Sequence, residues 1–282
     1  MSFLKYENNI LKFEGVAISE IAKGRTTPFY CYSQNTLIDN FKNFANSVAS
    51  FDSTVCFSLK SNSNLTLLKT LEKLGAGADV VSEWEMRKAL KAGISAKNIV
   101  FSGIGKTDKD IQFAINNDCF QINVESIDEL NRVNEIAASI GKVQKIGIRI
   151  NPDIKADTHK KISTGSLEDK FGVSIEDTHK IFQNRANYSS LKISSIAFHI
   201  GSNIKELNPF ENTFSLIGDL AKKINSETSI IDTIDVGGGL SPQKRNFTFE
   251  DYAKLIHKYF DLDGIKFIFE PGRLISADAG IL

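Results

Sequence analysis

Short apolar runs alternate with amphipathic segments along most of this 282-residue chain, and this alternation restricts the fold more than any other feature. Each run is apolar on both faces, as expected for parallel strands that helices cover. The segments between them repeat apolar residues at helical spacing, as Leu65, Leu68 and Leu71 do. The predicted strands are residues 55–60, 78–82, 98–102, 120–124, 145–151, 195–200, 231–237 and 266–270.

Eight strand–helix repeats are the number found in a closed (β/α)8 TIM barrel, an α/β fold. A further helix is predicted over residues 33–50, before the first strand. Ser82, Thr107 and Ser126 each precede acidic residues, and a capping hydroxyl followed by acids favours a helix start. A doubly wound open sheet is the alternative, but the sequence has no early GxGxxG turn.

Residues 1–27 do not follow this repeat. Residues 6–13 predict a β-hairpin with its turn at Asn8-Asn9. An isolated hairpin is marginally stable in water, and the sequence suggests no other antiparallel strand for it to join. We therefore expect residues 1–27 to belong to a second β domain, largely missing from a chain that ends at Leu282, and residues 28–282 to form the barrel.

The charge balance excludes some classes of partner. Lysine and arginine number 34, as do aspartate and glutamate, so nucleic acid is not an expected partner. No run approaches the roughly 20 apolar residues of a membrane helix. The polar N-terminus is unlike a secretory signal, and three cysteines without CxxC spacing indicate reduced thiols in the cytoplasm. Four scattered histidines without an HExxH motif predict no metal site.

Functional side chains of a barrel follow the C-terminal ends of its strands. Polar residues stand at nearly every predicted end, and they would converge on one mouth. Lys60 closes the first strand, where its amine could bind an aldehyde; alternatively, its ammonium reaches solvent along an apolar stem. The set is Lys60, Ser82, Ser102, Asn123, Arg149, Asn151, His199, Gly237, Gly238, Gly239, Glu270 and Arg273.

Two of these segments suggest the kind of cofactor. The glycines 237–239 could cradle a phosphate because no Cβ blocks the backbone N–H groups, although a flexible turn would look the same. Glu270 precedes the turn Pro271-Gly272, where its carboxylate could keep a pyridine nitrogen protonated; a helix cap or an ion pair with Arg273 are the alternatives. Together with Lys60, these segments predict a phosphate-bearing aldehyde cofactor.

Three other side chains could complete such a site. His199 could stack on a flat heterocycle, although a lone histidine on an apolar strand is more often a core residue. Ser202 could donate a hydrogen bond to a phosphate, and the planar fork of Arg273 could bind a phosphate or a carboxylate. The irregular stretch 152–172 is long enough to be functional, or else it is a surface insertion.

At this point the chain resembles the fold type III, alanine-racemase-like family of pyridoxal-phosphate decarboxylases. Within that family, Arg149-Ile150-Asn151-Pro152-Asp153 and the stretches 159–165 and 170–172 are similar to the diaminopimelate decarboxylases. The resemblance covers nearly the whole chain, and the combined motifs are highly specific. The four family signatures correspond to residues 57–62 (FSLKSN), 199–202 (HIGS), 237–239 (GGG) and 270–273 (EPGR).

The resemblance implies pyridoxal 5′-phosphate as the cofactor, with Lys60 as the Schiff-base lysine, His199 stacked on the ring and Glu270 at the pyridine nitrogen. It implies decarboxylation of meso-2,6-diaminopimelate, an amino-acid substrate, to L-lysine and carbon dioxide, the last step of lysine biosynthesis. Arg273 and Arg149 would lie near that substrate. The implied phosphate site comprises Ser202, Gly237, Gly238, Gly239, Glu270, Pro271, Gly272 and Arg273.

The same resemblance implies a homodimer in the full-length form, with a β-rich domain after the barrel that reaches the neighbouring active site. This chain alone is therefore expected to bind cofactor weakly and to be poorly active. A non-catalytic pyridoxal-phosphate carrier barrel has the same fold and lysine, but it would not need Glu270 or the stretch 152–172. A regulatory pseudoenzyme, a racemase and another basic-amino-acid decarboxylase also stay open.

Overall fold

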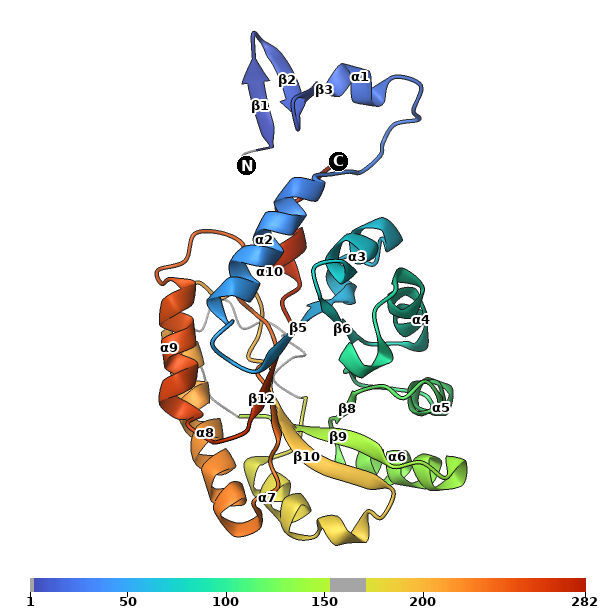
Figure 1. The fold of residues 1–282 in the computed structure, drawn as a ribbon, viewed down its shortest axis with the longest axis vertical. Helices are drawn as coiled ribbons and strands as arrows, with labels where there is room; N and C mark the ends of the chain where they lie inside the picture. Colours follow the sequence, from blue (N-terminus) through green and yellow to red (C-terminus); the bar gives the residue numbers. More distant parts are fainter. Residues whose placement is uncertain (1–2, 153–170) are drawn as a thin grey trace, which may run out of the picture.

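Eight parallel strands close into a barrel in the computed structural model, which describes residues 3–152 and 171–282 (Figure 1). Each strand pairs with the next along the chain, and β12 pairs with β5 to close the ring. The predicted TIM barrel is thus confirmed and the open sheet is wrong. The strands are β5 (Ser53–Ser58), β6 (Gly77–Val80), β7 (Ile99–Phe101), β8 (Gln121–Val124), β9 (Gln144–Arg149), β10 (Leu191–Ala197), β11 (Thr233–Asp235) and β12 (Lys266–Phe269).

Helices surround the barrel and bury their apolar faces against it (Figure 1). The helix predicted before the first strand is present as α2 (Gln34–Ser47), which contacts both α3 and α9 and so completes the outer ring. The other helices are α3 (Leu65–Glu72), α4 (Glu83–Ala92), α5 (Asp108–Asn116), α6 (Ile127–Ile140), α7 (Ile175–Gln183), α8 (Asn208–Thr228), α9 (Phe249–Tyr259) and α10 (Arg273–Ser276), with short 3₁₀ turns at η1 (Leu59–Ser61), η2 (Ala96–Asn98) and η4 (Arg185–Asn187).

The predicted helix caps are present. The Ser82 hydroxyl accepts a hydrogen bond from the backbone N–H of Glu85, and Thr107 forms a complete capping box with Asp110. Ser126 caps α6 by accepting a hydrogen bond from the N–H of Glu129. The capping box is not complete, because the Glu129 carboxylate accepts from the N–H of Glu125 and not from that of Ser126. These caps satisfy N–H groups that the first turn of a helix leaves without partners.

Two predicted strands extend too far. Lys60 lies in η1 and not in a strand, because β5 ends at Ser58. His199 follows β10, which ends at Ala197. Both side chains therefore belong to the loops beyond the C-terminal ends of the strands, and this is where a barrel of this class carries its functional groups.

The predicted hairpin is confirmed as β1 (Leu4–Glu7) and β2 (Ile10–Phe13), with Asn8 and Asn9 at φ 53° and 62° in the turn. Positive φ at both turn positions gives the twist that a two-residue hairpin needs, and asparagine tolerates it. The expectation that no other antiparallel strand exists was wrong. A third strand, β3 (Val16–Ala17), pairs with β2, and β4 (Cys31–Tyr32) pairs with β13 (Gly280–Ile281).

The small sheet β1–β3, with the short helix α1 (Ile18–Ala22), stands apart from the barrel, on the side where both ends of the chain lie (Figure 1). Glu14 connects this sheet to the barrel helices, because its carboxylate accepts hydrogen bonds from Ser33 and Asn35 at the start of α2. A negative charge is favourable there, since the N-terminus of a helix carries partial positive charge.

Candidate active site

A pocket opens at the C-terminal ends of the barrel strands, with an empty volume of about 370 Å³. This space includes the open solvent above the strand ends. Its walls come from every part of the ring, so no single helix or loop forms the site. The lining residues are Lys60, Val81, Ser102, Gly103, Asn123, Arg149, Ala197, Phe198, His199, Asp235 and Glu270.

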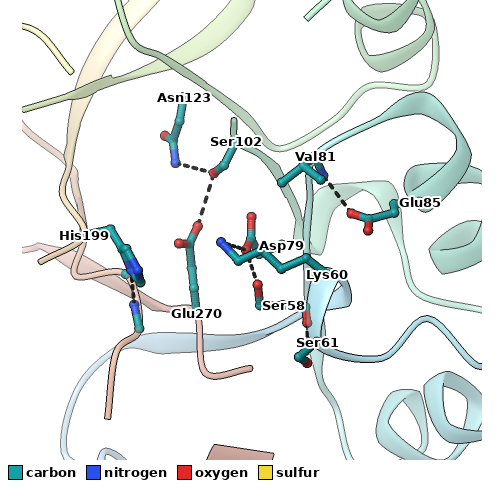
Figure 2. A network of polar contacts seen from close by, with 12 residues as sticks. Ser58, Lys60, Ser61, Asp79, Val81, Glu85, Ser102, Asn123, His199 and Glu270 are labelled. Carbon is teal, nitrogen blue, oxygen red and sulfur yellow. Dashed lines mark hydrogen bonds and ion pairs between the residues drawn. The ribbon is translucent and has the colours of Figure 1, made fainter. Parts of the chain in front are cut away.

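Lys60 enters this pocket from the tight turn η1. Figure 2 shows its side chain directed toward Asp79 and Glu270. The Lys60 Nζ lies 4.0 Å from Asp79 Oδ2, and the same oxygen accepts a 2.6 Å hydrogen bond from the Ser58 hydroxyl. Ser58 and Asp79 are opposite each other on β5 and β6, so the strand register fixes the carboxylate beneath the amine. The other Asp79 oxygen is buried without a hydrogen-bond partner in the described structure.

Glu270 lies next to Asp235, and the two carboxyl groups are hydrogen-bonded. Burial, and then the charges of Asp235 and Asp79, raise the pKa of Glu270 well above its usual value, while the Lys60 ammonium opposes this rise. Burial also raises the pKa of Asp235 to about 6. Two carboxyl groups this close cannot both ionise readily, so the pair holds a proton near neutral pH.

Asn123 connects opposite walls of the barrel. Its Nδ2 donates to Ser102 Oγ at 3.0 Å and to Asp235 Oδ2 at 2.8 Å, although β8 and β11 are not neighbours in the ring. The Ser102 hydroxyl in turn donates to Glu270 Oε1 at 3.4 Å, as Figure 2 shows. A Cβ on Gly147 would overlap the Asn123 side chain, so the glycine in β9 leaves room for this bridge.

His199 is held as a neutral imidazole. Burial, together with the charges of Lys60 and Arg149, lowers its pKa to about 3. The backbone N–H of Gly238 donates to its Nδ1 at 3.2 Å (Figure 2), so the ring proton is on Nε2. An uncharged, oriented aromatic ring at the pocket wall is suited to stacking against a flat heterocycle.

The glycines 237–239 join three strand ends. A Cβ on Gly237 would overlap the carbonyl oxygen of Phe198, one on Gly238 that of Glu270, and one on Gly239 that of Gly201. Gly237 and Gly239 also have φ of +68° and +106°, a region that other residues rarely adopt. Glycine is therefore required by close backbone packing here, in addition to any role in holding an anion.

The remaining predicted site residues lie around the pocket and do not line it. Ser202 is exposed in the loop after β10, and Arg273 is exposed at the first position of α10. Pro271 accepts a hydrogen bond from the Ser58 N–H, and Gly272 packs against Ser58 and Ser61. This turn is thus fixed against the residues that position Lys60.

Arg149 does reach the pocket, and its Nη1 lies 2.9 Å from Glu125 Oε1. Asn151 follows it, and Ser82 serves as a helix cap. Residues 153–170, which include most of the stretch 152–172 identified from the sequence, lie outside the described residues. Within the described ranges, no group of three histidine, cysteine or acidic side chains could hold a metal ion. No helix in those ranges is long and apolar enough to cross a membrane.

Comparison with known families identifies this arrangement. The family model described as pyridoxal-dependent decarboxylase, pyridoxal binding domain, matches residues 34–277. The chain belongs to this family. The match spans the barrel from α2 to α10 and includes every residue that lines the pocket.

The family includes relatives with more specific names. The chain is 37% identical to the diaminopimelate decarboxylase of Aquifex aeolicus over 99% of this chain and 67% of that protein. It is 38% identical to the Pseudomonas fluorescens protein of the same name, over all of this chain and 69% of that one. The diaminopimelate decarboxylase from Helicobacter pylori complexed with L-lysine superposes with a TM-score of 0.86 at 37% identity, over 93% of this chain and 68% of that one. The chain thus spans about two thirds of the length of its relatives.

Pyridoxal 5′-phosphate is the cofactor of this pyridoxal-dependent decarboxylase, and the residues present fit it. A primary amine at Lys60 can bind the aldehyde, and the neutral ring of His199 can lie against the heterocycle. The proton-bearing pair of Glu270 and Asp235 offers a partner for a pyridine nitrogen. The glycines 237–239, which follow β11, have no Cβ atoms, so a phosphate could approach their backbone.

The sequence-based prediction missed the buried polar residues beneath the site. Asp79 and Asp235 are each 1% exposed, and neither had been assigned a role. Asp79 lies within β6 and Asp235 is the last residue of β11, and an acid buried this deeply is unusual enough to have identified both. Lys106 is also buried, where its Nζ donates to the carbonyls of Gly103 and Asn123 and fixes two of the loops.

Proposed function

We propose that this protein, in the full-length form, decarboxylates meso-2,6-diaminopimelate to L-lysine and carbon dioxide. The observation that supports this most strongly is the convergence of Lys60, His199 and the Glu270–Asp235 pair on one pocket, in a chain 35–38% identical to diaminopimelate decarboxylases over nearly its whole length. Solved structures of similar proteins named diaminopimelate decarboxylase contain L-lysine, the product of that reaction.

In this proposal Lys60 would hold the cofactor through its aldehyde, at the position where the amine of the substrate would replace it. Asp79 positions the amine, because its carboxylate is fixed by Ser58 and lies 4.0 Å from Lys60 Nζ. His199 holds the ring plane, and Glu270 is the partner of the pyridine nitrogen. When bound, the cofactor supplies an electron-withdrawing ring that accepts the electron pair left when carbon dioxide departs.

Phosphate binding is assigned to the turn at the ends of β10, β11 and β12. Ser202, Gly237, Gly238, Gly239 and the turn 270–273 surround it. Of their backbone donors, the N–H of Gly237 bonds to Asp235 and that of Gly238 to His199 in this structure. Arg273 is exposed beside them and could bind a phosphate or a substrate carboxylate.

Arg149 is assigned to the substrate. It lines the pocket beside Phe198 and His199, and its guanidinium already pairs with the buried carboxylate of Glu125. A guanidinium anchored on one side keeps a fixed orientation for a carboxylate on the other.

We also propose that residues 1–27 belong to a second, β-rich domain and that residues 28–282 form the cofactor-binding barrel. The small sheet β1–β3 supports this assignment, because Tyr6, Ile10 and Val16 on it are exposed apolar side chains. The enzyme is proposed to be a homodimer in the cytoplasm. The three free cysteines are compatible with a reducing compartment. Sedimentation analysis of the full-length protein tests the dimer.

The decisive assay measures carbon dioxide release and L-lysine formation from meso-diaminopimelate in the presence of pyridoxal phosphate. It compares this chain with a protein of the length of its relatives, and it includes L-ornithine and L-arginine as competing substrates. Release from diaminopimelate alone supports the proposal. Release only from ornithine or arginine would assign a different decarboxylase, and cofactor binding without any release would favour the carrier barrel.

A further inference from the structure

Asp235 has hydrogen-bond partners that favour its ionised form. The backbone N–H of Gly237 donates to Oδ1 at 3.0 Å, and the Asn123 amide donates to Oδ2 at 2.8 Å. Both partners are N–H donors, and each lowers the pKa of this buried carboxyl against the effect of burial. A carboxylate that receives two such bonds is stabilised in its charged state.

Asn123 is itself committed to this orientation. Its two Nδ2 hydrogens go to Asp235 and Ser102, and its Oδ1 accepts from Gln121 Nε2 at 2.8 Å. The amide therefore presents a donor, and not an acceptor, to Asp235. An O–H on the aspartate would have to turn toward Glu270 instead, which leaves the proton shared between these two carboxyl groups.

Glu270 has the opposite environment. Its carboxyl group faces Asp235 from β11 and Asp79 from β6, both negative when ionised, and the Ser102 hydroxyl from the β7 loop. Lys60, in η1, is the cation that most reduces this effect, and the neutral ring of His199 and the guanidinium of Arg149 also line the pocket. Because the donors that reach Asp235 are N–H groups that favour its ionised form, Glu270 is the member of the pair that is suited to carry the proton.

We propose that Asp235 is a positioning residue that keeps one proton on Glu270 in the cofactor-free protein, ready for the pyridine nitrogen. When the ring binds, the O–H bond of Glu270 breaks and an N–H bond forms on the ring nitrogen. The carboxylate of Glu270 then pairs with the resulting cation, and the Asp235 charge supports that pair from behind. This inference rests on the proposed placement of Glu270 at the pyridine nitrogen.

The first experiment locates the proton in the wild-type, cofactor-free protein. Glutamate and aspartate are labelled with ¹³C at the side-chain carboxyl, and the two signals are assigned with Glu270→Gln and Asp235→Asn. At neutral pH, we expect the Glu270 carbon to titrate as a protonated acid and the Asp235 carbon as a carboxylate. The reverse assignment, or two ionised groups at that pH, would overturn the proposal.

The second experiment asks whether Asp235 is the cause. Asp235→Asn should lower the pKa of Glu270 by at least about one unit, a tenfold change in proton occupancy. The matched control is Asp232→Asn, the same change three residues earlier on the opposite rim, and it should leave the titration of Glu270 unchanged. If both substitutions act equally, or neither acts, then Asp235 does not hold the proton; if Asp235→Asn does not fold, the wild-type measurement still decides.

A third measurement uses pyridoxine 5′-phosphate, which has no aldehyde and cannot react with Lys60. Its ultraviolet spectrum reports whether the bound ring nitrogen carries a proton. We expect this proton to be lost at a pH at least about one unit lower in Asp235→Asn than in Asp232→Asn. Equal values in the two variants contradict the proposal. A proton located on Glu270 in a protein that fails to bind this probe would instead count against the proposed function.

Discussion

The two ends of β11 handle negative charge in opposite ways. Asp232, just before the strand, receives ion pairs from Lys145 and Lys192, and their hydrogen bonds outweigh burial and lower its pKa to about 2. Asp235, three residues later, faces Glu270 and Asp79 with no lysine among the main influences on it, and burial raises its pKa to about 6. At the rim of Asp232 the carboxylate is paired with cations, whereas at the rim of Asp235 several carboxyl groups lie close together.

This difference separates stability from chemistry. The pKa of Asp232 is depressed, so its contribution to stability is present above the usual value of 3.8 and is lost as pH falls toward about 2. The pKa of Asp235 is raised, so the stability linked to its proton is present below 3.8 and is lost as pH rises through about 6. Near neutral pH the ionised Asp232 stabilises the barrel. The buried Asp235 destabilises it, but its charge keeps a proton available on Glu270.

The largest expected effect concerns the lysine that binds the cofactor. Lys60→Ala should abolish covalent attachment of pyridoxal phosphate, measured by borohydride reduction and peptide mass mapping. Lys145→Ala is the control from the opposite rim, and it is a demanding one because burial lowers the pKa of Lys145 and makes its amine more nucleophilic. Attachment that survives Lys60→Ala but disappears in Lys145→Ala would mean that Lys145, at the opposite rim, binds the cofactor.

Glu270→Gln should stabilise the fold. The raised pKa of Glu270 means that the folded protein keeps this group protonated at a cost that grows as pH rises. Glutamine carries no such cost, so we expect the free energy of unfolding at pH 8 to increase by roughly 2 kcal/mol, from about 1.4 kcal/mol per pKa unit. The gain should shrink toward pH 4, where the pair is protonated in both proteins. Urea unfolding at the two pH values measures this, and a gain that does not depend on pH would show that crowding of charge is not its cause.

The smallest effect is expected at the paired rim. Asp232→Asn should reduce the free energy of unfolding at pH 7 by about 1 kcal/mol, a value discounted because the side chain is 35% exposed and solvent screens its ion pairs. The loss should vanish as pH approaches about 2, where the wild-type carboxylate is also protonated. A variant more stable than the wild type at pH 7 would mean that the charge of Asp232 destabilises the fold, as that of Asp235 does at the other rim.

Sequence patterns predicted most of the fold because they reflect local rules. The strand–helix alternation gave the barrel, and two asparagines at positive φ formed the predicted turn of the hairpin. Strand ends were less certain, since the backbone of Lys60 turns into a 3₁₀ helix that no apolar pattern distinguishes from a strand. The third strand of the small sheet is two residues long, too short to produce any alternation.

The sequence predicted the side chains that line the pocket, but it did not predict the buried polar residues beneath them. Lys60, His199 and Glu270 stood at recognisable positions, and the structure brings them together. The electrostatics depend on Asp235 and Asn123, which meet across the barrel from strands that are not neighbours. A contact between residues 112 positions apart depends on how the ring closes, and no single segment contains that information.

The glycines at the end of β11 have one more consequence. Their missing Cβ atoms let carbonyl oxygens of Phe198, Gly201 and Glu270 approach, so three loops are joined by main-chain atoms alone. Packing between backbone atoms does not depend on which side chains surround it. Residues lining the mouth could then be exchanged over evolution to accept new substrates, while the platform beneath them keeps its shape.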